Sequence, residues 1–454
     1  MTPTRAASNR APRFCPLALA LALALVPGAP RAQTGQGDPG QEEDPRIQVV
    51  LEDARPLLRL ALAPLQGIGA LPPSRVEAAR ELESTLRADL EAAGIFTIQG
   101  PEELSVLRLT GDPSNDIDQY RSLGNEVAVE AEIRDEGGRL VLEGRVIDLG
   151  SRADILAKRY RGDYSIIRRV AHTFSDDIVL YFTGHKGLGM TSIAFWSDRS
   201  SHREIYVMDY DGHNQRQVTK HESISMAPAW SPRLDGLAYV SYFAGPPGVY
   251  FADLATGRKS PIVVDANHNG MPSFSPDGRQ LVFARSLEGN WEIFRCDRDG
   301  GNIRRLTHSA QIDTNPAWSP NGRDIAFTSA RSGRPHIYLM DAEGANLRRV
   351  SFDGDYNDGA AWHPAGTHVV YSSRRRSVFQ LALTDLVTLE TELLTSGSAG
   401  SETPTFSPDG RRVAFSSDRD GRPQIYVVDL RTRATERLTS EGRNWAPDWS
   451  GYLE

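Results

Sequence analysis

Cysteine is almost absent from this chain, which has two cysteines among its 454 residues. Cys15 lies in an N-terminal segment that we expect to be removed, so only Cys296 remains. An intramolecular disulfide and a cysteine-based zinc site are therefore excluded. Cys296 falls in an alternating stretch that predicts a strand. We expect it to be a small buried side chain rather than a reactive thiol.

Long apolar runs are also missing. One extended run covers residues 14–26 and is too short to span a bilayer. Arginines precede it, and a Pro27-Gly28 break with small residues up to Ala32 follows it, which predicts a secretory signal peptide over residues 1–32. Because Cys15 precedes the bulk of the run instead of following it, we do not expect a lipid anchor.

Positive charge is in deficit. The formal net charge is −8, and segment 1–32 holds four arginines and no acidic residue, so the rest of the chain is more acidic still. This balance disfavours nucleic acid and anionic membrane surfaces as partners. The 39% hydrophobic content is typical of a globular, core-forming chain.

Catalytic and cofactor motifs are missing as well. The sequence has no Gly-x-Ser-x-Gly elbow, no His-Glu-x-x-His pair and no phosphate-binding glycine loop. Its ten histidines show no metal-ligand spacing. We therefore expect no enzymatic activity, no cofactor and no metal ligand set built on histidine.

What the chain does have is a repeat of 44 residues over its last 260 or so positions. Two positions show the period, an aromatic residue and an aspartate that ends an apolar run. The aromatic positions are Trp230, Phe274, Trp318, Trp362, Phe406 and, one residue early, Trp449, and the aspartates are Asp209, Asp253, Asp297, Asp341, Asp385 and Asp429. A period of this length with short alternating strands predicts a β-propeller with one four-stranded blade per repeat.

The strand count predicts six blades and the way in which the ring closes. The first unit, which begins near Ser192, has no inner strand before it, and Pro447-Asp448-Trp449 stands alone at the end of the chain. We expect this last strand to complete the first blade, which leaves no open edge.

Most repeated residues have a structural explanation. Pro-Asp-Gly is a tight-turn sequence, so Asp277 and Asp409 are predicted to form turns rather than to act as acid catalysts. The strand-ending aspartates are predicted to cap the following turn, and the aromatic residues to pack between blades. Trp445 lies outside the repeat, and two interpretations remain open for it, the mouth of the channel and the closing core.

Before the propeller, residues 45–187 predict a small α/β domain with a mixed sheet. Strands are expected over 46–51, 57–65 and 155–160, helices over 72–94, 102–106, 118–123 and 165–183, and a hairpin turns at Gly137-Gly138. Residues 33–44 offer no apolar surface to bury, and this tail is either a spacer or a peptide-like ligand for another protein. The propeller is assigned to residues 188–454.

One face of the predicted propeller varies from blade to blade. The loops before the inner strands and those between the second and third strands emerge there, whereas the Pro-Asp-Gly turns emerge on the other face. The varied segments are residues 225–227, 269–271, 313–315, 357–359 and 401–403. We place partner binding on this variable face, with Asn357 among its candidates; the alternative is ordinary solvated loops. Asp313, Asp358 and Glu402 could also converge on the channel and hold a cation.

The order of signal peptide, α/β domain and six blades resembles the TolB family of Tol–Pal systems, over essentially the whole chain after residue 32. The stretches that carry the resemblance are Ala54-Arg55-Pro56, His172-Thr173-x-Ser175-Asp176, Thr183-Gly184-x-Lys186-Gly187, Asp209-Tyr210-Asp211-Gly212-x-Asn214, His268-Asn269-Gly270 and Trp449-Ser450-x-Tyr452-Leu453. Between about residues 100 and 151 no motif matches, and two turns depart from the pattern, at Arg233-Leu234 and Ala365-Gly366.

The resemblance implies a non-enzymatic scaffold in the periplasm, with roles in outer-membrane integrity and in constriction at cell division. It implies that the lipoprotein Pal binds the propeller loops and links the chain peripherally to the outer membrane. Residues 33–47 would bind TolA, and colicin translocation domains would use the same surfaces. The Pal contacts implied are His268, Asn269, Gly270, Met271 and Thr314.

The sequence leaves two other functions open. The first is the gating propeller of a serine exopeptidase, which needs a hydrolase domain with Gly-x-Ser-x-Gly; the chain ends within five residues of Trp449 and shows no such motif. The second is a propeller that binds glycans or other small ligands. The sequence leaves open the exact cleavage site, the affinities and the order of partner binding.

Overall fold

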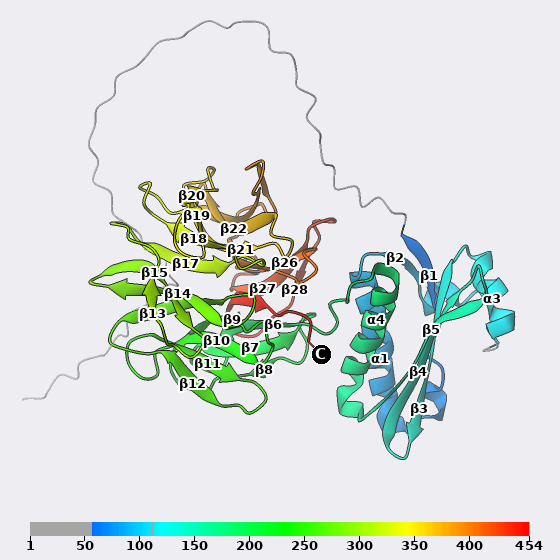
Figure 1. The fold of residues 1–454 in the computed structure, drawn as a ribbon. Helices are drawn as coiled ribbons and strands as arrows, with labels where there is room; N and C mark the ends of the chain where they lie inside the picture. Colours follow the sequence, from blue (N-terminus) through cyan, green and yellow to red (C-terminus); the bar gives the residue numbers. More distant parts are fainter. Residues whose placement is uncertain (1–56, 111–112, 454) are drawn as a thin grey trace, which may run out of the picture. The chain divides into compact units, whose positions relative to one another are not determined.

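The computed structural model describes residues 57–110 and 113–453. The predicted signal peptide, the tail over 33–44 and the strand expected over 46–51 lie outside the described residues. An α/β domain comes first in the chain and is followed by a ring of β-sheets (Figure 1). Within these ranges no helix is both long and apolar enough to cross a membrane.

The α/β domain contains a mixed five-stranded sheet with the order β2-β1-β3-β4-β5. β1 pairs in parallel with β2 and β3, whereas β3, β4 and β5 form an antiparallel meander. The strands are β1 (Leu58–Leu62), β2 (Phe96–Gln99), β3 (Val127–Glu136), β4 (Arg139–Asp148) and β5 (Ala153–Gly162). The helices are η1 (Ile68–Ala70), α1 (Pro73–Ala92), α2 (Pro101–Leu104), α3 (Pro113–Ser122), η2 (Tyr164–Ile166) and α4 (Ile167–Thr183).

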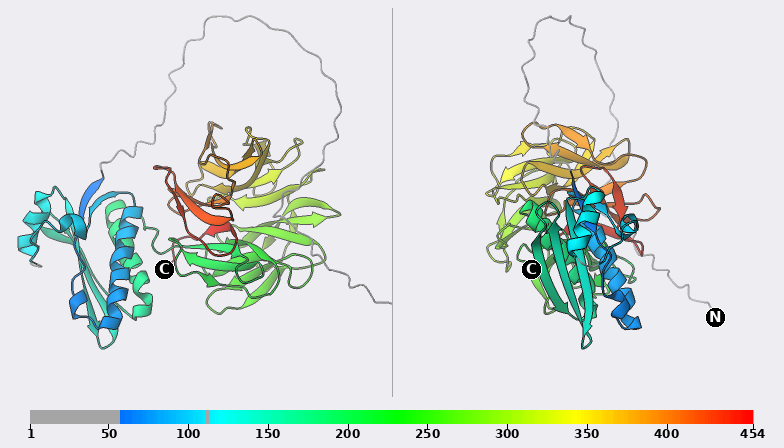
Figure 2. Two further views of the ribbon diagram at one scale, coloured as in Figure 1. Left: turned by 180° about the vertical axis from the view of Figure 1, so that it is seen from behind. Right: turned by 90° about the vertical axis from the view of Figure 1, so that its right-hand side faces the viewer.

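Alternation along β1 divides the core of this domain between the two faces of the sheet. Leu60 and Leu62 pack with α1 and α4 on one face, and Ala61 and Ala63 pack with Leu104 and neighbours from α2 and α3 on the other. Figure 2 shows α1 and α4 side by side along the sheet. The wide apolar stripe of α1 explains why the longest helix of the domain is buried against α4.

The ends of the two long helices follow from their sequences. α1 begins at Pro73, where proline supplies a helical φ and lacks an N–H that the first turn could not use. α4 ends at Gly184, which adopts φ 76° and donates its N–H to the carbonyl of Leu180.

The propeller has six four-stranded sheets, as predicted. Blade 1 contains β29 (Asn444–Trp449), β6 (Ser192–Ser197), β7 (Glu204–Asp209) and β8 (Arg216–Gln217); blade 2 contains β9 (Ser225–Trp230), β10 (Gly236–Ser241), β11 (Gly248–Asp253) and β12 (Lys259–Val263). Blade 3 contains β13 (His268–Phe274), β14 (Gln280–Leu287), β15 (Asn290–Asp297) and β16 (Arg304–Arg305); blade 4 contains β17 (Asp313–Trp318), β18 (Asp324–Ser329), β19 (His336–Asp341) and β20 (Arg348–Arg349). Blade 5 contains β21 (Tyr356–Trp362), β22 (His368–Arg375), β23 (Val378–Asp385) and β24 (Thr391–Leu393); blade 6 contains β25 (Ser401–Phe406), β26 (Arg412–Ser417), β27 (Gln424–Asp429) and β28 (Thr435–Arg437).

The ring closes through β29, which pairs antiparallel with β6. Ser450 and Leu453 extend this pairing, donating backbone N–H groups to the carbonyls of Ser192 and Met190. Trp449 is buried, and its indole Nε1 donates to Thr191 Oγ1 at 2.9 Å. The predicted closure by the last strand is confirmed.

The structural roles predicted for repeated residues are also confirmed. The Pro-Asp-Gly turns place Gly278 and Gly410 at φ 66° and 72°. Strand-ending aspartates cap the following turns, as where Asp385 accepts the N–H groups of Val387 and Thr388. Cys296 is buried, and burial raises the pKa of its thiol to about 12, so it is not a reactive thiolate.

Some predicted boundaries were wrong. The first described strand covers only Leu58–Leu62 instead of 57–65. Its regular pairing with β2 ends there, and the N–H groups of Ala63 and Gln66 donate to carbonyls of β3 instead. α3 begins at Pro113 rather than near residue 118, since a proline at the first helical position initiates it. β5 extends beyond the predicted 155–160 because it pairs along the whole of β4.

Candidate functional site

The variable face is assembled from two kinds of loop, as the strand order predicts. A residue at the start of several inner strands donates its N–H to the loop between the second and third strands of the preceding blade. Asn269 bonds Pro247, Asn357 bonds Pro335, and Asn444 bonds Pro423, at 2.8–2.9 Å. The inner strands β9, β13, β17, β21, β25 and β29 follow one another around the ring. Their starts therefore form one surface with the neighbouring loops.

Each inner strand carries a β-bulge at the same place. The pairing register shifts there in every blade, and a residue of left-handed conformation lies in the shift. These residues are Ala227, Met271, Asn315, Gly359, Thr403 and Ala446, with φ between 48° and 65°. A bulge bends the strand and redirects the side chains beside it.

Three of the predicted contact residues have buried side chains. Asn269 donates to Asp265 Oδ1 at 3.2 Å, Asp313 forms a 2.7 Å ion pair with Arg331, and Asn357 donates to His336 Nδ1 at 2.9 Å. All three are 0% exposed. They hold the loops in place from within the blades. Their side chains are therefore not available for direct contact with a partner.

The other predicted residues range from buried to exposed. His268 is exposed and its ring lies 6.4 Å from that of Trp291. Gly270 and Thr314 are buried next to the bulges, and Met271 packs partly against the core between blades 3 and 4. Asp358 is half-buried and accepts hydrogen bonds from Asn315 and Thr328 of the preceding blade.

The acidic residues of this face do not all converge. Asp313 is directed to Arg331 of its own blade, whereas Asp358 and Glu402 stand at equivalent positions of adjacent blades. Burial, followed by the charges of Asp358 and Asp418, raises the pKa of Glu402 to about 7. Within the described residues, these carboxylates do not form a group of three with metal-ligand spacing. The cation hypothesis for Asp313, Asp358 and Glu402 stays a prediction.

The opposite face of the propeller carries hydrogen bonds to the α/β domain. Arg411 and Arg412 follow the Pro-Asp-Gly turn of blade 6 and donate to the carbonyls of Ala93 and Ala92 at the end of α1. Helix ends leave such carbonyls unpaired, so the two guanidinium groups cap α1. Tyr210 of blade 1 donates to Asp89 Oδ1 of α1 at 2.7 Å.

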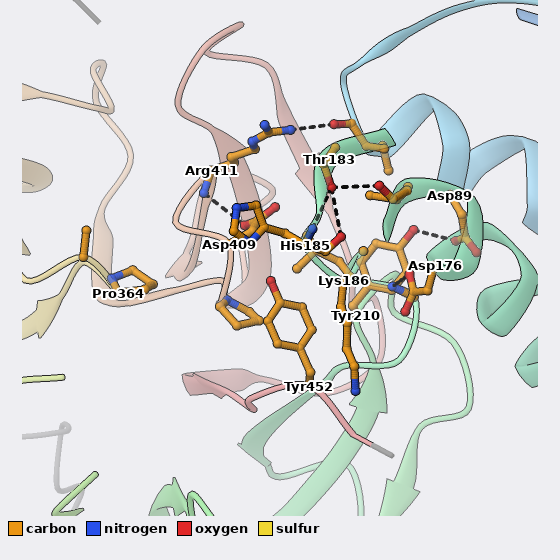
Figure 3. Close-up of a pocket in the computed structure, with 18 of the residues that line it drawn as sticks. Asp89, Asp176, Thr183, His185, Lys186, Tyr210, Pro364, Asp409, Arg411 and Tyr452 are labelled. Carbon is orange, nitrogen blue, oxygen red and sulfur yellow. Dashed lines mark hydrogen bonds between the residues drawn. The ribbon is translucent and has the colours of Figure 1, made fainter. Parts of the chain in front are cut away.

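A cleft of about 380 Å³ lies beside these contacts, lined by residues of α1, α4, the linker and the propeller turns (Figure 3). Asp176 accepts the N–H groups of Gly189 and Met190, both at 3.0 Å. Burial raises the pKa of the Asp176 carboxyl to about 6 despite these hydrogen bonds. A Cβ on Gly187 would come within 2.3 Å of this carboxylate, so the close approach of the linker requires glycine there.

A family model described as the TolB β-propeller domain matches residues 180–453. The chain belongs to the TolB β-propeller family. Among curated relatives, it is 33% identical over 235 residues to a "Protein TolB homolog" of Chlorobium chlorochromatii, covering 51% of this chain and 52% of that protein. It is 34% identical over 202 residues to a "Tol-Pal system protein TolB" of Desulfosudis oleivorans, covering 44% and 46%. The chain thus matches about half the length of these curated relatives.

A crystal structure of TolB from Acinetobacter baumannii has the same fold over both parts of the chain. It matches with a TM-score of 0.73 and 24% identity, covering 87% of this chain and 97% of that one. The similarity extends to the α/β domain, which precedes the residues that the TolB propeller model matches. The fold expected from the resemblance is therefore confirmed.

Several of the residues that carry the resemblance lie where the α/β domain meets the propeller. His172, Ser175, Asp176 and Tyr210 all take part in hydrogen bonds there. Asp89, the shared partner of His172, Ser175 and Tyr210, was not predicted from the sequence. No spacing pattern connects Asp89 with a tyrosine that is 121 positions away.

Proposed function

We propose that this chain is a non-enzymatic periplasmic scaffold of a Tol–Pal system. In this proposal the variable face of the propeller binds a Pal-type lipoprotein, and residues 33–47 bind TolA. Through these partners the chain supports outer-membrane integrity and constriction during division. The observation that carries the proposal is the TolB propeller match over residues 180–453, together with relatives that are named as Tol–Pal components.

The geometry of the variable face supports this assignment. The buried polar residues Asn269, Asp313 and Asn357 hold its loops in place. The side chains of these loops differ from blade to blade. A scaffold of this kind presents a preorganised surface, which lowers the entropic cost of binding a folded partner. The opposite face already makes hydrogen bonds to α1 through Arg411 and Arg412, so the variable face is the one we assign to Pal.

The first test introduces charge on the variable face. In a Met271→Arg/Thr314→Arg variant, two long cations would stand at a bulge and at its neighbouring strand, and we expect Pal affinity to fall at least tenfold. A matched control is Ala345→Arg/Leu347→Arg, which adds the same charge to exposed positions in the β19–β20 turn on the opposite face. Binding of purified Pal is measured by calorimetry, with circular dichroism to verify folding.

The control should bind Pal as the wild type does. Equal binding by the Met271→Arg/Thr314→Arg variant, in a folded protein, would show that Pal docks elsewhere. Deletion of residues 33–47 from the same chain should abolish TolA binding and leave Pal able to bind. Loss of neither interaction would reject the assignment of that segment.

The two alternative functions, a peptidase-type propeller and a glycan-binding propeller, predict different results for the same purified protein. A peptidase-type propeller would support hydrolysis of aminoacyl-peptide substrates, and a glycan-binding propeller would give reproducible signals on a glycan array. The described residues include no serine elbow to supply a nucleophile, and we therefore propose a function that requires no catalysis.

A further inference from the structure

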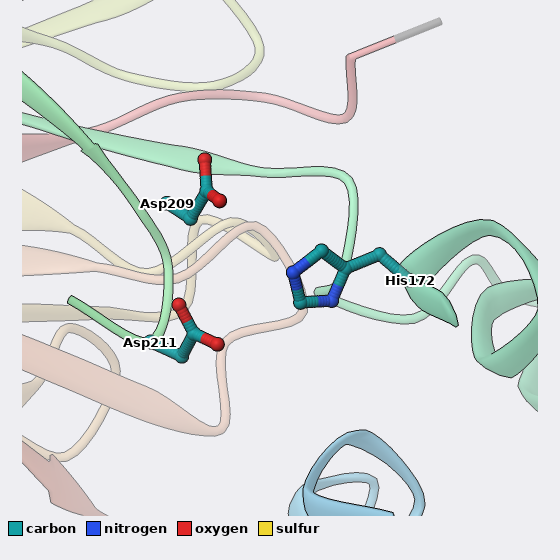
Figure 4. A group of neighbouring side chains, drawn as sticks. All are labelled: His172, Asp209 and Asp211. Carbon is teal, nitrogen blue, oxygen red and sulfur yellow. The ribbon is translucent and has the colours of Figure 1, made fainter. Parts of the chain in front are cut away.

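Helix α4 brings one histidine against the first turn of the propeller. His172, Asp209 and Asp211 place one candidate ligand atom each within 4.8 Å of one another (Figure 4). His172 comes from the α/β domain, whereas the two aspartates end β7 and begin the turn to β8. The three side chains therefore meet only when the domain and the propeller are in contact.

The contact between its Nδ1 and Asp89 fixes the orientation of the His172 imidazole. His172 Nδ1 lies 2.8 Å from Asp89 Oδ2, and Asp89 also accepts hydrogen bonds from Ser175 and Tyr210 at 2.6 and 2.7 Å. With two other donors already on it, the Asp89 carboxylate acts as an acceptor, so Nδ1 carries the hydrogen. A carboxylate on one ring nitrogen that directs the other nitrogen outward is the arrangement found behind metal-binding histidines.

The other ring nitrogen has no partner. His172 is 2% exposed, and its Nε2 is buried without a hydrogen bond. Figure 4 shows this nitrogen pointing between the carboxylates of Asp209 and Asp211. A neutral imidazole with hydrogen on Nδ1 presents a lone pair there, so three electron-pair donors face one another around one point.

The propeller repeat explains the aspartates only in part. Asp297 and Asp299 stand at the same positions in blade 3, and Asp297 accepts the side-chain amide of Asn302 at 2.6 Å as Asp209 accepts that of Asn214. Both pairs are turn formers. Only the blade 1 pair has a buried histidine nitrogen directed at it, within the part of the chain that the structure describes.

The charge of the cluster favours a cation. Arg168 forms an ion pair with Asp211 and offsets one carboxylate. Asp211 also lies 3.2 Å from His213 Nδ1, and Asp209 accepts a hydrogen bond from the neutral side-chain amide of Asn214. One imidazole nitrogen with two carboxylate oxygens is a donor set that suits zinc and related divalent transition metals, which often keep a water as fourth ligand.

We propose that His172 Nε2, Asp209 and Asp211 bind a divalent transition-metal cation, zinc being the chemistry that fits best. Asp89, Ser175 and Tyr210 position the histidine and do not touch the metal. A cation held in this way joins α4 to blade 1. The proposal does not depend on Pal or TolA.

The test measures zinc binding to the full chain without its signal peptide, purified without a tag and treated with chelator. Calorimetry should give one zinc ion per chain, and added zinc should raise the midpoint of thermal unfolding because it binds the folded state alone. Cobalt(II) provides a second readout, since its visible absorption bands report a four-coordinate site.

Two variants and one matched control complete the test. Asp209→Asn removes a ligand but keeps an acceptor for Asn214, and we expect zinc affinity to fall at least tenfold, in the range typical of disturbed zinc sites. Asp297→Asn makes the same change in blade 3 and should leave zinc affinity unchanged. His172→Asn should abolish the cobalt bands.

The outcomes separate clearly. Stoichiometric binding that is lost in Asp209→Asn and kept in Asp297→Asn supports the site. Absence of one-to-one zinc binding to the folded wild type overturns it. Equal zinc affinity in the wild type, Asp209→Asn and a folded His172→Asn variant also overturns it, because the ion would then be bound elsewhere.

Discussion

Asp358 and Glu402 occupy the same repeat position in consecutive blades, one residue before the left-handed bulge residue. A buried carboxylate beside another acid is costly to ionise, because the charged form loses hydration and gains repulsion. This explains why the pKa of Glu402 rises to about 7 from its ordinary value of 4.5. The residue pair makes the stability of the propeller depend on pH.

The direction of that dependence follows from proton binding. Between pH 4.5 and 7 the folded chain keeps a proton on Glu402 that the unfolded chain has lost. Stability should therefore fall as pH rises through this window, by about 3.5 kcal/mol at most if each pKa unit corresponds to about 1.4 kcal/mol. Glu402→Gln mimics the protonated form and should be more stable than the wild type at pH 8 but not at pH 4.5.

Chemical denaturation of both proteins at the two pH values measures this difference. The exposed Glu390, replaced by Gln, serves as the matched control and should show no pH-dependent difference from the wild type. A Glu402→Gln variant whose stability relative to the wild type is the same at both pH values would contradict the expected cost of ionisation.

Residue-scale details were the hardest to predict from the sequence. Asn269, Asp313 and Asn357 lie at the starts of inner strands and are of residue types common in solvated loops, yet they are fully buried. The bulges were not anticipated, because only Gly359 among the six left-handed residues is a glycine. Non-glycine residues adopt this conformation only where the surrounding structure imposes it.

At the scale of elements, the last strand decides whether the ring is closed. β29 supplies the inner strand of blade 1 and contributes the buried Trp449. Without it, the backbone groups of β6 that face β29 lose their partners and form an exposed sheet edge. Such edges pair readily with added strands.

Removal of residues 444–454 should therefore open the ring. We expect the shortened chain to associate or aggregate and to lose its cooperative thermal transition, and a peptide of residues 444–454 added in trans should restore part of that transition. A scrambled peptide is the control. If the shortened chain is monomeric, unfolds as cooperatively as the wild type and binds Pal, the closing role of β29 is refuted.

Element order and type were largely predictable, because they follow from local patterns. Apolar spacing predicts the helix α1, and Gly137-Gly138 predicts the turn of the β3–β4 hairpin. The 44-residue period predicts the blades. The start of α3 was missed, since Pro113 was not taken as a helix initiator. Local periodicity predicts the existence of a helix or strand more reliably than it predicts the residue at which that element begins.

At the scale of the whole molecule, two faces of the propeller have different roles in this account. One carries the hydrogen bonds to the α/β domain through Tyr210, Arg411 and Arg412. The other carries the varied inner-strand loops. These long-range contacts could not be predicted from the sequence, because they join residues such as Asp89 and Tyr210 for which no local pattern exists.

The central claim is that a Pal-type lipoprotein docks on the variable face. Hydrogen–deuterium exchange of the full chain with and without purified Pal tests it most directly. We predict that Pal slows exchange in the segments at residues 267–272, 311–316, 355–360 and 399–404, and leaves exchange unchanged in the turns at residues 276–279 and 408–411. Protection of those turns, with no change in the inner-strand loops, would contradict the account.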